Sequence, residues 1–164
     1  MNKEWIADDL WRDAMQFERY NPRMTVNILR RIVSLFPDTW AVIPVVDDII
    51  RIAEDYRWWD DAIAAAKLAQ WLPHSPDRDG YAFTVKRLQL LKAGRRVEAL
   101  VLAMEYNSVE SMWYCRIYAA EFAKLGEYDR ARELYARAEL LARSNEQQHM
   151  NTFVGGEQPI RTRA

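Results

Sequence analysis

The sequence has little of what several protein classes require: five glycines, six prolines and a single cysteine among 164 residues. Because tight turns depend on glycine and proline, so few of them argue against an all-β fold. The lone Cys115 cannot form an internal disulfide, and the opening segment MNKEWIADDLWRD lacks the apolar stretch of a secretory signal. We therefore expect a reducing, cytoplasmic setting.

A dominant charge and long apolar runs are also missing. The formal net charge of −1 gives no electrostatic reason to expect nucleic acid as a partner. No apolar stretch approaches the ~20 residues of a membrane-spanning helix, so no span is expected. Half of the residues are apolar and 29% are charged, which is the composition of a globular protein, and the length suits one domain.

The residue patterns of common catalytic sites are absent as well. His74 and His149 have no neighbours suited to metal binding, and Cys115 lies among apolar residues, as a buried thiol does. Gly155-Gly156 is not followed by the Lys and Ser or Thr of a phosphate-binding loop. We therefore predict a protein that is not an enzyme and that holds no metal or cofactor.

A sequence motif recurs in the C-terminal half of the chain. Its copies are LQLLKAGRRVEALVLA and AEFAKLGEYDRARELYARA. In each, an apolar helical segment runs into a glycine, Gly94 or Gly126, and an alanine follows five residues later, Ala99 or Ala131. Glycine can take the left-handed conformation that ends a helix, and alanine lets two helices approach closely. Each copy therefore predicts a helical hairpin.

A third copy, DYRWWDDAIAAAKLAQWLP, carries Ala62 in the same role but has Arg57 where the glycine would be. The three alanines are spaced 37 and then 32 residues apart. Such a period is typical of stacked helical hairpins, none of which can bury its apolar face alone. Stacked hairpins form a curved surface that can hold a peptide.

Periodicity and helix-breaking residues divide the chain into eight expected helices. They cover about 2–19, 23–35, 40–55, 59–71, 81–93, 95–106, 109–124 and 127–143. Asp38 and Thr39 offer a cap for the third helix, and after Arg143 we expect only a short helical turn and a mobile tail. The expected organisation is one domain over 1–145 followed by a tail over 146–164. The domain comprises an atypical hairpin over 1–38 and repeat units over 40–71, 81–106 and 109–143.

The repeat resembles the tetratricopeptide repeat (TPR) family. The residues that carry the resemblance most clearly are Gly126, Tyr128, Ala131, Tyr135 and Ala138. The resemblance implies an all-α fold, a TPR-like right-handed α-solenoid of about four antiparallel helix hairpins, or about eight helices. Residues 1–38 of the chain match the repeat poorly.

A narrower resemblance points to a function. The segments LAQWL (68–72), VKRLQLLKAGRRVEAL (85–100) and LLARSNEQQHMNTFVGG (140–156) look like parts of the small cytoplasmic chaperones of bacterial type III secretion needle subunits. The resemblance implies a chaperone that masks an amphipathic helix of a secreted needle or translocator subunit, together with a small co-chaperone. A homodimer is left open.

Repeat geometry predicts which residues would hold the partner, because the first helix of each unit lines the concave side of such a solenoid. The candidate partner-binding residues are Tyr81, Leu88, Leu91, Trp113, Arg116 and Lys124. Leu88, Leu91 and Trp113 would be apolar anchors, and Arg116 and Lys124 would pair with acidic groups. The second unit offers only a polar stretch of Asp47, Arg51 and Glu54, which suits a rim.

One other interpretation of the function stays open. The chain could be an adaptor or scaffold that joins folded protein partners, in which case it would be soluble without a partner.

The seven tryptophans of the chain are its one compositional outlier. We expect most of them to pack between helices, where a buried indole covers much apolar area, and some to lie exposed as anchors for a partner.

Overall fold

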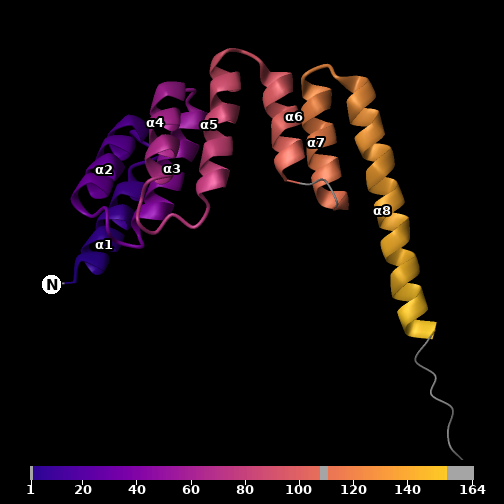
Figure 1. The fold of residues 1–164 in the computed structure, drawn as a ribbon, viewed down its shortest axis with the longest axis horizontal. Coiled ribbons are helices and arrows are strands. Elements are labelled where there is room, and N and C mark those ends of the chain that lie inside the picture. The colour runs from indigo at the N-terminus through magenta and orange to yellow at the C-terminus, as the bar shows by residue number, and fades with distance from the viewer. Residues whose placement is uncertain (1, 108–110, 155–164) are drawn as a thin grey trace, which may run out of the picture. The chain divides into compact units, whose positions relative to one another are not determined.

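The computed structural model describes the backbone of residues 2–107 and 111–154 and the side chains of 2–107 and 111–144. Within these ranges the chain is all-α, with eight helices and no strand (Figure 1). The helices are α1 (Lys3–Gln16), α2 (Pro22–Leu35), α3 (Val42–Asp55), α4 (Trp59–Ala69), α5 (Arg78–Lys92), α6 (Arg96–Tyr106), α7 (Met112–Lys124) and α8 (Tyr128–Val154). The expectation of about eight helices in an all-α fold is confirmed.

Side-chain caps explain where four of the helices begin. Asn2, Asn21, Asp77 and Ser111 each accept a hydrogen bond from a backbone N–H in the first turn of α1, α2, α5 and α7. The expected cap of α3 by Asp38 or Thr39 is wrong. This helix begins after Ala41 without a side-chain cap. Thr39 is buried, and its hydroxyl donates to the carbonyl of Phe36 at 2.9 Å instead.

Three helices end in the same way. Arg57, Gly94 and Gly126 follow α3, α5 and α7 with φ of 59°, 76° and 81°, so all three adopt the left-handed conformation. At each end the N–H of that residue bonds to the carbonyl three residues back, and the next N–H bonds to the carbonyl five residues back. This double pattern is the Schellman motif. It confirms that Arg57 takes the place of the repeat's glycine.

The two terminal helices depart from expectation. α1 stops at Gln16 rather than near 19, and its end shows none of the left-handed residues found after α3, α5 and α7. α8 continues to Val154, well beyond Arg143. The expected stop at Arg143 is wrong, because the sequence has no glycine or proline from there until Gly155. The part of the expected tail over 155–164 lies outside the described residues.

The chain divides into two compact units, Met1–Ala99 and Leu100–Ala164, and the boundary falls within α6. In the first unit each helix from α1 to α5 packs against the next. Their shared core is built on Val26, Leu29, Ile49 and Ile52, among others, and it includes fully buried alanines of α4. Thr25 takes the place that Ala62 has in the next hairpin: it is fully buried, 37 residues earlier in the chain. The expectation of a single domain over 1–145 stays a prediction.

The second unit is built on the packing of α7 against α8. Its buried residues are Cys115, Tyr118, Ala119 and Phe122 on α7 and Ala131, Leu134 and Ala138 on α8. Tyr118 also ties α7 to α6, because its hydroxyl donates to the carbonyl of Ala103 at 3.0 Å and accepts from Asn107 at 2.7 Å. The small residues Ala131 and Ala138 are buried, as the repeat pattern predicts.

Candidate partner-binding site

Ion pairs and hydrogen bonds occupy the polar residues of α3 in the first unit. Arg51 makes a two-pronged ion pair with Glu18, which follows α1, with N–O distances of 2.8 and 2.9 Å. The indole N–H of Trp11 in α1 donates to Asp48 at 2.9 Å. Because the hydrogen bond from Arg51 stabilises the charged form, it lowers the pKa of Glu18, although burial opposes the change. These bonds join α3 to α1 and its C-terminal turn.

The same helix is joined to α5 through Tyr81, one of the predicted partner-binding residues. The Tyr81 hydroxyl donates to Asp47 at 2.7 Å, and Arg87 makes a two-pronged ion pair with Glu54 at 2.6 Å. Asp47 is exposed overall, but its carboxylate group is partly shielded from water. This desolvation raises the pKa of Asp47, and the hydrogen bond from Tyr81 opposes the rise. Burial and the Asp47 hydrogen bond together raise the pKa of Tyr81. The Tyr81 hydroxyl is therefore already engaged within the chain.

The other two predicted contacts on α5 differ from each other. Leu88 is 0% exposed and belongs to the core of the first unit, so its side chain is not available to a partner in this structure. Leu91 is half-buried and packs against that core. The expectation that Leu88 faces outward as an anchor does not match its position, because α5 buries Val85 and Leu88 as its inner face.

The three predicted contacts on α7 are all exposed. Trp113 is 63% exposed, and its ring meets that of Tyr114 edge-on at a centroid distance of 5.2 Å. Arg116 is exposed, and Lys124 forms an ion pair with Glu121 in the same helix. Ile117, one turn after Trp113, is also exposed. The outer face of α7 is therefore accessible within the second unit, as a partner-binding surface has to be.

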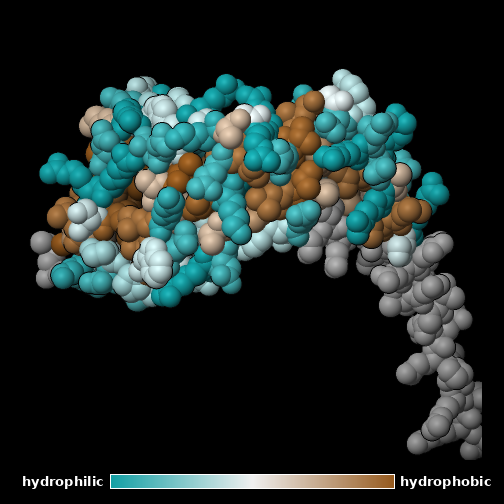
Figure 2. Space-filling model, turned by 45° about the horizontal axis from the view of Figure 1, so that its top comes forward, coloured by the Kyte–Doolittle hydropathy of each residue, from teal (hydrophilic) through white to brown (hydrophobic). Residues whose placement is uncertain are grey.

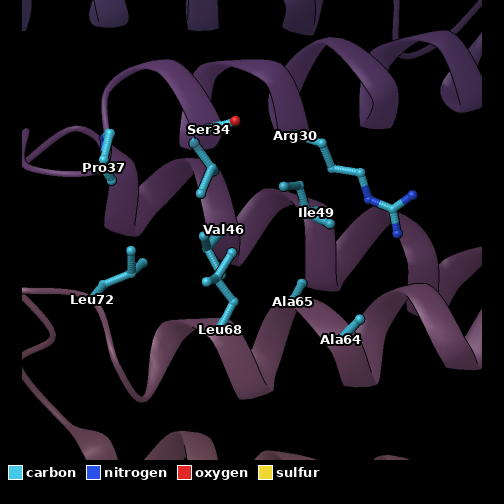
Figure 3. A pocket seen from close by; sticks show the side chains of 10 residues that line it. Arg30, Ser34, Pro37, Val46, Ile49, Ala64, Ala65, Leu68 and Leu72 are labelled. Carbon is cyan, nitrogen blue, oxygen red and sulfur yellow. The ribbon is translucent and has the colours of Figure 1, made fainter.

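An apolar groove lies elsewhere in the first unit, between α2 and α4 with α3 as its floor (Figure 3). Its volume is about 410 Å³. It is lined by Arg30, Val33, Ser34, Pro37, Val46, Ile49, Ala64, Ala65, Leu68 and Leu72. Figure 3 shows Arg30 and Ala64 at one end, Pro37 and Leu72 at the other, and Val46 and Leu68 between them. We call this hollow the α2–α4 groove; an apolar concavity of this size is a common form of binding site.

Charged side chains close one end of the α2–α4 groove. Asp61 at the start of α4 accepts from Arg30 at 2.6 Å and also pairs with Arg23. Burial favours the neutral acid, but the hydrogen bonds of the two arginines outweigh it and lower the pKa of Asp61. The two arginines outnumber Asp61, so this end carries an excess of positive charge, while the middle of the groove stays apolar.

This groove was not predicted from the sequence, because the first helix of each hairpin was expected to carry the binding surface. The α2–α4 groove instead lies between the second helices of the first two hairpins. A usable signal was present in the run AIAAAKLA of α4. Ala64 and Ala65 are small and leave room, and Leu68 follows on the same side, 46% exposed. Small residues beside an exposed leucine indicate a hollow with an apolar wall.

The second unit has a groove in the corresponding place, between α6 and α8 with Phe122 of α7 as its floor. Its volume is about 540 Å³. Counting from the shared alanines Ala62 and Ala131, its residues Glu133 and Arg137 correspond to Ala64 and Leu68 of the α2–α4 groove. The two grooves therefore share a position but differ in chemistry, because the second is walled by charged side chains.

α6 adds apolar surface beside this second groove. Its sequence RVEALVLAMEY has apolar residues on all sides, yet of its residues Ala99 alone is buried. Residues 100–104 are half-buried, and Figure 2 shows apolar side chains gathered at the surface over α6. Helices that are apolar on all sides are normally buried.

The tryptophans divide almost evenly between core and surface. Trp11, Trp58 and Trp59 pack against the core of the first unit. The four exposed ones are Trp5, Trp40, Trp71 and Trp113. Packing between helices therefore accounts for three of the seven, fewer than expected.

Two features of the described residues bear on other functions. Within the described ranges no group of three or more His, Cys, Asp or Glu side chains could hold a metal ion. Across the same part of the chain, no helix has both the length and the apolarity needed to cross a membrane. Comparison with known proteins adds no family, because no protein-family model, curated protein or solved structure matches the chain.

Proposed function

We propose that the chain is a non-enzymatic, cytoplasmic protein-binding module that holds an amphipathic helix of a secreted protein, as type III secretion chaperones do. The observation that carries the proposal is the α2–α4 groove. Its apolar middle suits the apolar face of a helix, whose side chains at i, i+3 and i+4 would dock there. The resemblance of three segments to needle-subunit chaperones supports the secreted nature of the client.

The same proposal includes the finer fold, a TPR-like right-handed solenoid of four hairpins. The three matching helix ends at Arg57, Gly94 and Gly126 support it, because a solenoid repeats one local structure along the chain. The buried alanines Ala62 and Ala131 at the corresponding positions support it as well. The exposed aromatic face of α7 around Trp113 would be a second contact surface for the client.

The proposal is tested by co-purification of the full chain from its native host, followed by mass spectrometry of what stays bound. A fluorescent synthetic copy of the recovered protein's amphipathic helix is then titrated with the wild type, Leu68→Glu and Leu140→Glu. Both leucines are exposed, so both variants should fold, but Leu140 lies on α8 in the second unit. We expect Leu68→Glu to weaken binding at least tenfold, or about 1.4 kcal/mol, and Leu140→Glu to change it less than twofold.

One result of the co-purification and titration would contradict the proposal. Recovery of large folded proteins alone, held equally well by the wild type and Leu68→Glu, would contradict a helix-holding groove. That result would favour an adaptor that joins folded partners.

A further inference from the structure

A second pocket in the first unit lies at the start of α1, away from the residues of the α2–α4 groove. It has a volume of about 380 Å³ and is lined by Glu4, Trp5, Asp8, Asp9, Arg12 and Trp40. Neither the predicted partner contacts nor the α2–α4 groove includes any of these residues. We call it the two-tryptophan pocket.

Both tryptophans of this pocket lie open to solvent. Trp5 is 74% exposed and Trp40 is 58% exposed. An indole gains free energy when its apolar rings leave water, and the three packed tryptophans of the same unit do so. Two exposed indoles that line one hollow therefore offer surface that a ligand can cover.

The charge of the pocket is negative. Three carboxylates line it against one guanidinium, and Arg12 is committed to Asp8 by an ion pair one turn along α1. Glu4 lies in the first turn, where the helix dipole favours an acid, but Asp9 lies beyond that turn. With Arg12 and Asp8 paired to each other, Glu4 and Asp9 leave the pocket with an excess of negative charge, which favours a cationic ligand.

The chain itself contains the interaction that such a pocket would offer. In the same unit, the Arg23 guanidinium lies over the ring of Trp58 at 4.6 Å from its centroid and pairs with Asp61. Tryptophan is the best aromatic partner for a cation, and carboxylates bind the planar guanidinium in a two-pronged way. The two-tryptophan pocket presents indoles and carboxylates, and its own cation, Arg12, is paired with Asp8.

We infer that the two-tryptophan pocket binds an arginine side chain of a protein partner. The guanidinium would lie against Trp5 and Trp40 and donate to Glu4 and Asp9. A metal ion fits less well, since no metal-binding group of three acidic side chains exists among the described residues. The inference does not depend on the α2–α4 groove, so either can fail alone.

The test follows the indole N–H signals of the full chain by NMR, with Trp5, Trp40 and Trp71 assigned from single Trp→Phe variants. The probe is the synthetic peptide acetyl-Gly-Arg-Gly-Arg-Gly-amide. Matched peptides carry citrulline, which has the same shape without the charge, or lysine. Trp71 serves as the internal control because it is 79% exposed in the same unit and does not line the pocket.

We expect the arginine peptide to shift the signals of Trp5 and Trp40 and to leave that of Trp71 in place. Trp40→Ala should weaken its binding at least fivefold, and Trp71→Ala should not change it. Equal shifts with the citrulline peptide, equal shifts at Trp71, or no effect of Trp40→Ala would overturn the inference. Equally strong binding of the lysine peptide would overturn the assignment to arginine.

Discussion

Arg57 and Gly126 occupy the same left-handed position, with φ of 59° and 81°, after the first helices of two hairpins. The hydrogen bonds around them match: Trp58 donates to the carbonyl of Ala53 at 2.7 Å, and Glu127 donates to that of Phe122 at 3.0 Å. A residue with a Cβ pays a conformational penalty there that glycine does not. The chain therefore tolerates an unfavourable backbone conformation at Arg57 to keep the repeated helix end.

Replacing Arg57 with glycine should stabilise the protein. The left-handed conformation costs a non-glycine residue about 1–2 kcal/mol, whereas the extra freedom of glycine in the unfolded chain costs about 0.5–1 kcal/mol. The free energy of unfolding should therefore rise by about 0.5–1 kcal/mol. Urea unfolding of the full chain, followed by circular dichroism, measures the change.

In two control variants the free energy of unfolding should fall instead. Gly126→Ala should lower stability by about 1 kcal/mol through conformation alone, because an added Cβ would meet no atom within 4 Å. Arg31→Gly, an exposed arginine inside α2, should also lower stability by about 1 kcal/mol. A fall in stability for Arg57→Gly as large as that for Arg31→Gly would contradict the interpretation.

The ion pair of Glu18 and Arg51 should make stability depend on pH. The Arg51 hydrogen bond lowers the pKa of Glu18 in the folded state below its ordinary value of 4.5. The folded state therefore binds this proton less tightly than the unfolded state does. The pair stabilises the protein above that ordinary pKa, and its contribution is lost as pH falls through the lowered value.

Urea midpoints of the wild type and Glu18→Gln, compared from pH 7 to pH 3, test this. The wild type should be the more stable at pH 7, and the difference should shrink on acidification. Glu139→Gln, at an exposed position of α8, is the matched control and should follow the wild type throughout. A Glu18→Gln difference that stays constant across this range would show that the ion pair does not stabilise the fold.

The sequence predicted the helices well because their limits depend on local signals. Asn21-Pro22 separates α1 from α2, and the three left-handed ends were marked by Gly94, Gly126 and the substituted Arg57. The errors came where local signals were weak. α8 runs past Arg143 because no helix-breaking residue follows until Gly155.

The position of Leu88 shows why the candidate site was harder to predict. The buried residues of α7 lie at fixed distances before Gly126 in the sequence. The residues at the same distances before Gly94 include Lys86 and Arg87, which would then lie on the inner face of α5. Charged side chains are costly to bury, so α5 buries Val85 and Leu88 instead. The repeat pattern alone cannot predict such a rotation of one helix about its axis, because packing against the neighbouring helices determines which face is buried.

The most direct test of the central claim is photo-crosslinking of the client helix to single positions of the chain. Benzoylphenylalanine would replace Ala64, which lines the α2–α4 groove, Lys67, which is exposed on α4 but does not line it, or Trp113 on α7. The account predicts strong crosslinking of the client from position 64 and little from position 67. Crosslinking from position 113 without any from position 64 would contradict the claim that the α2–α4 groove holds the client.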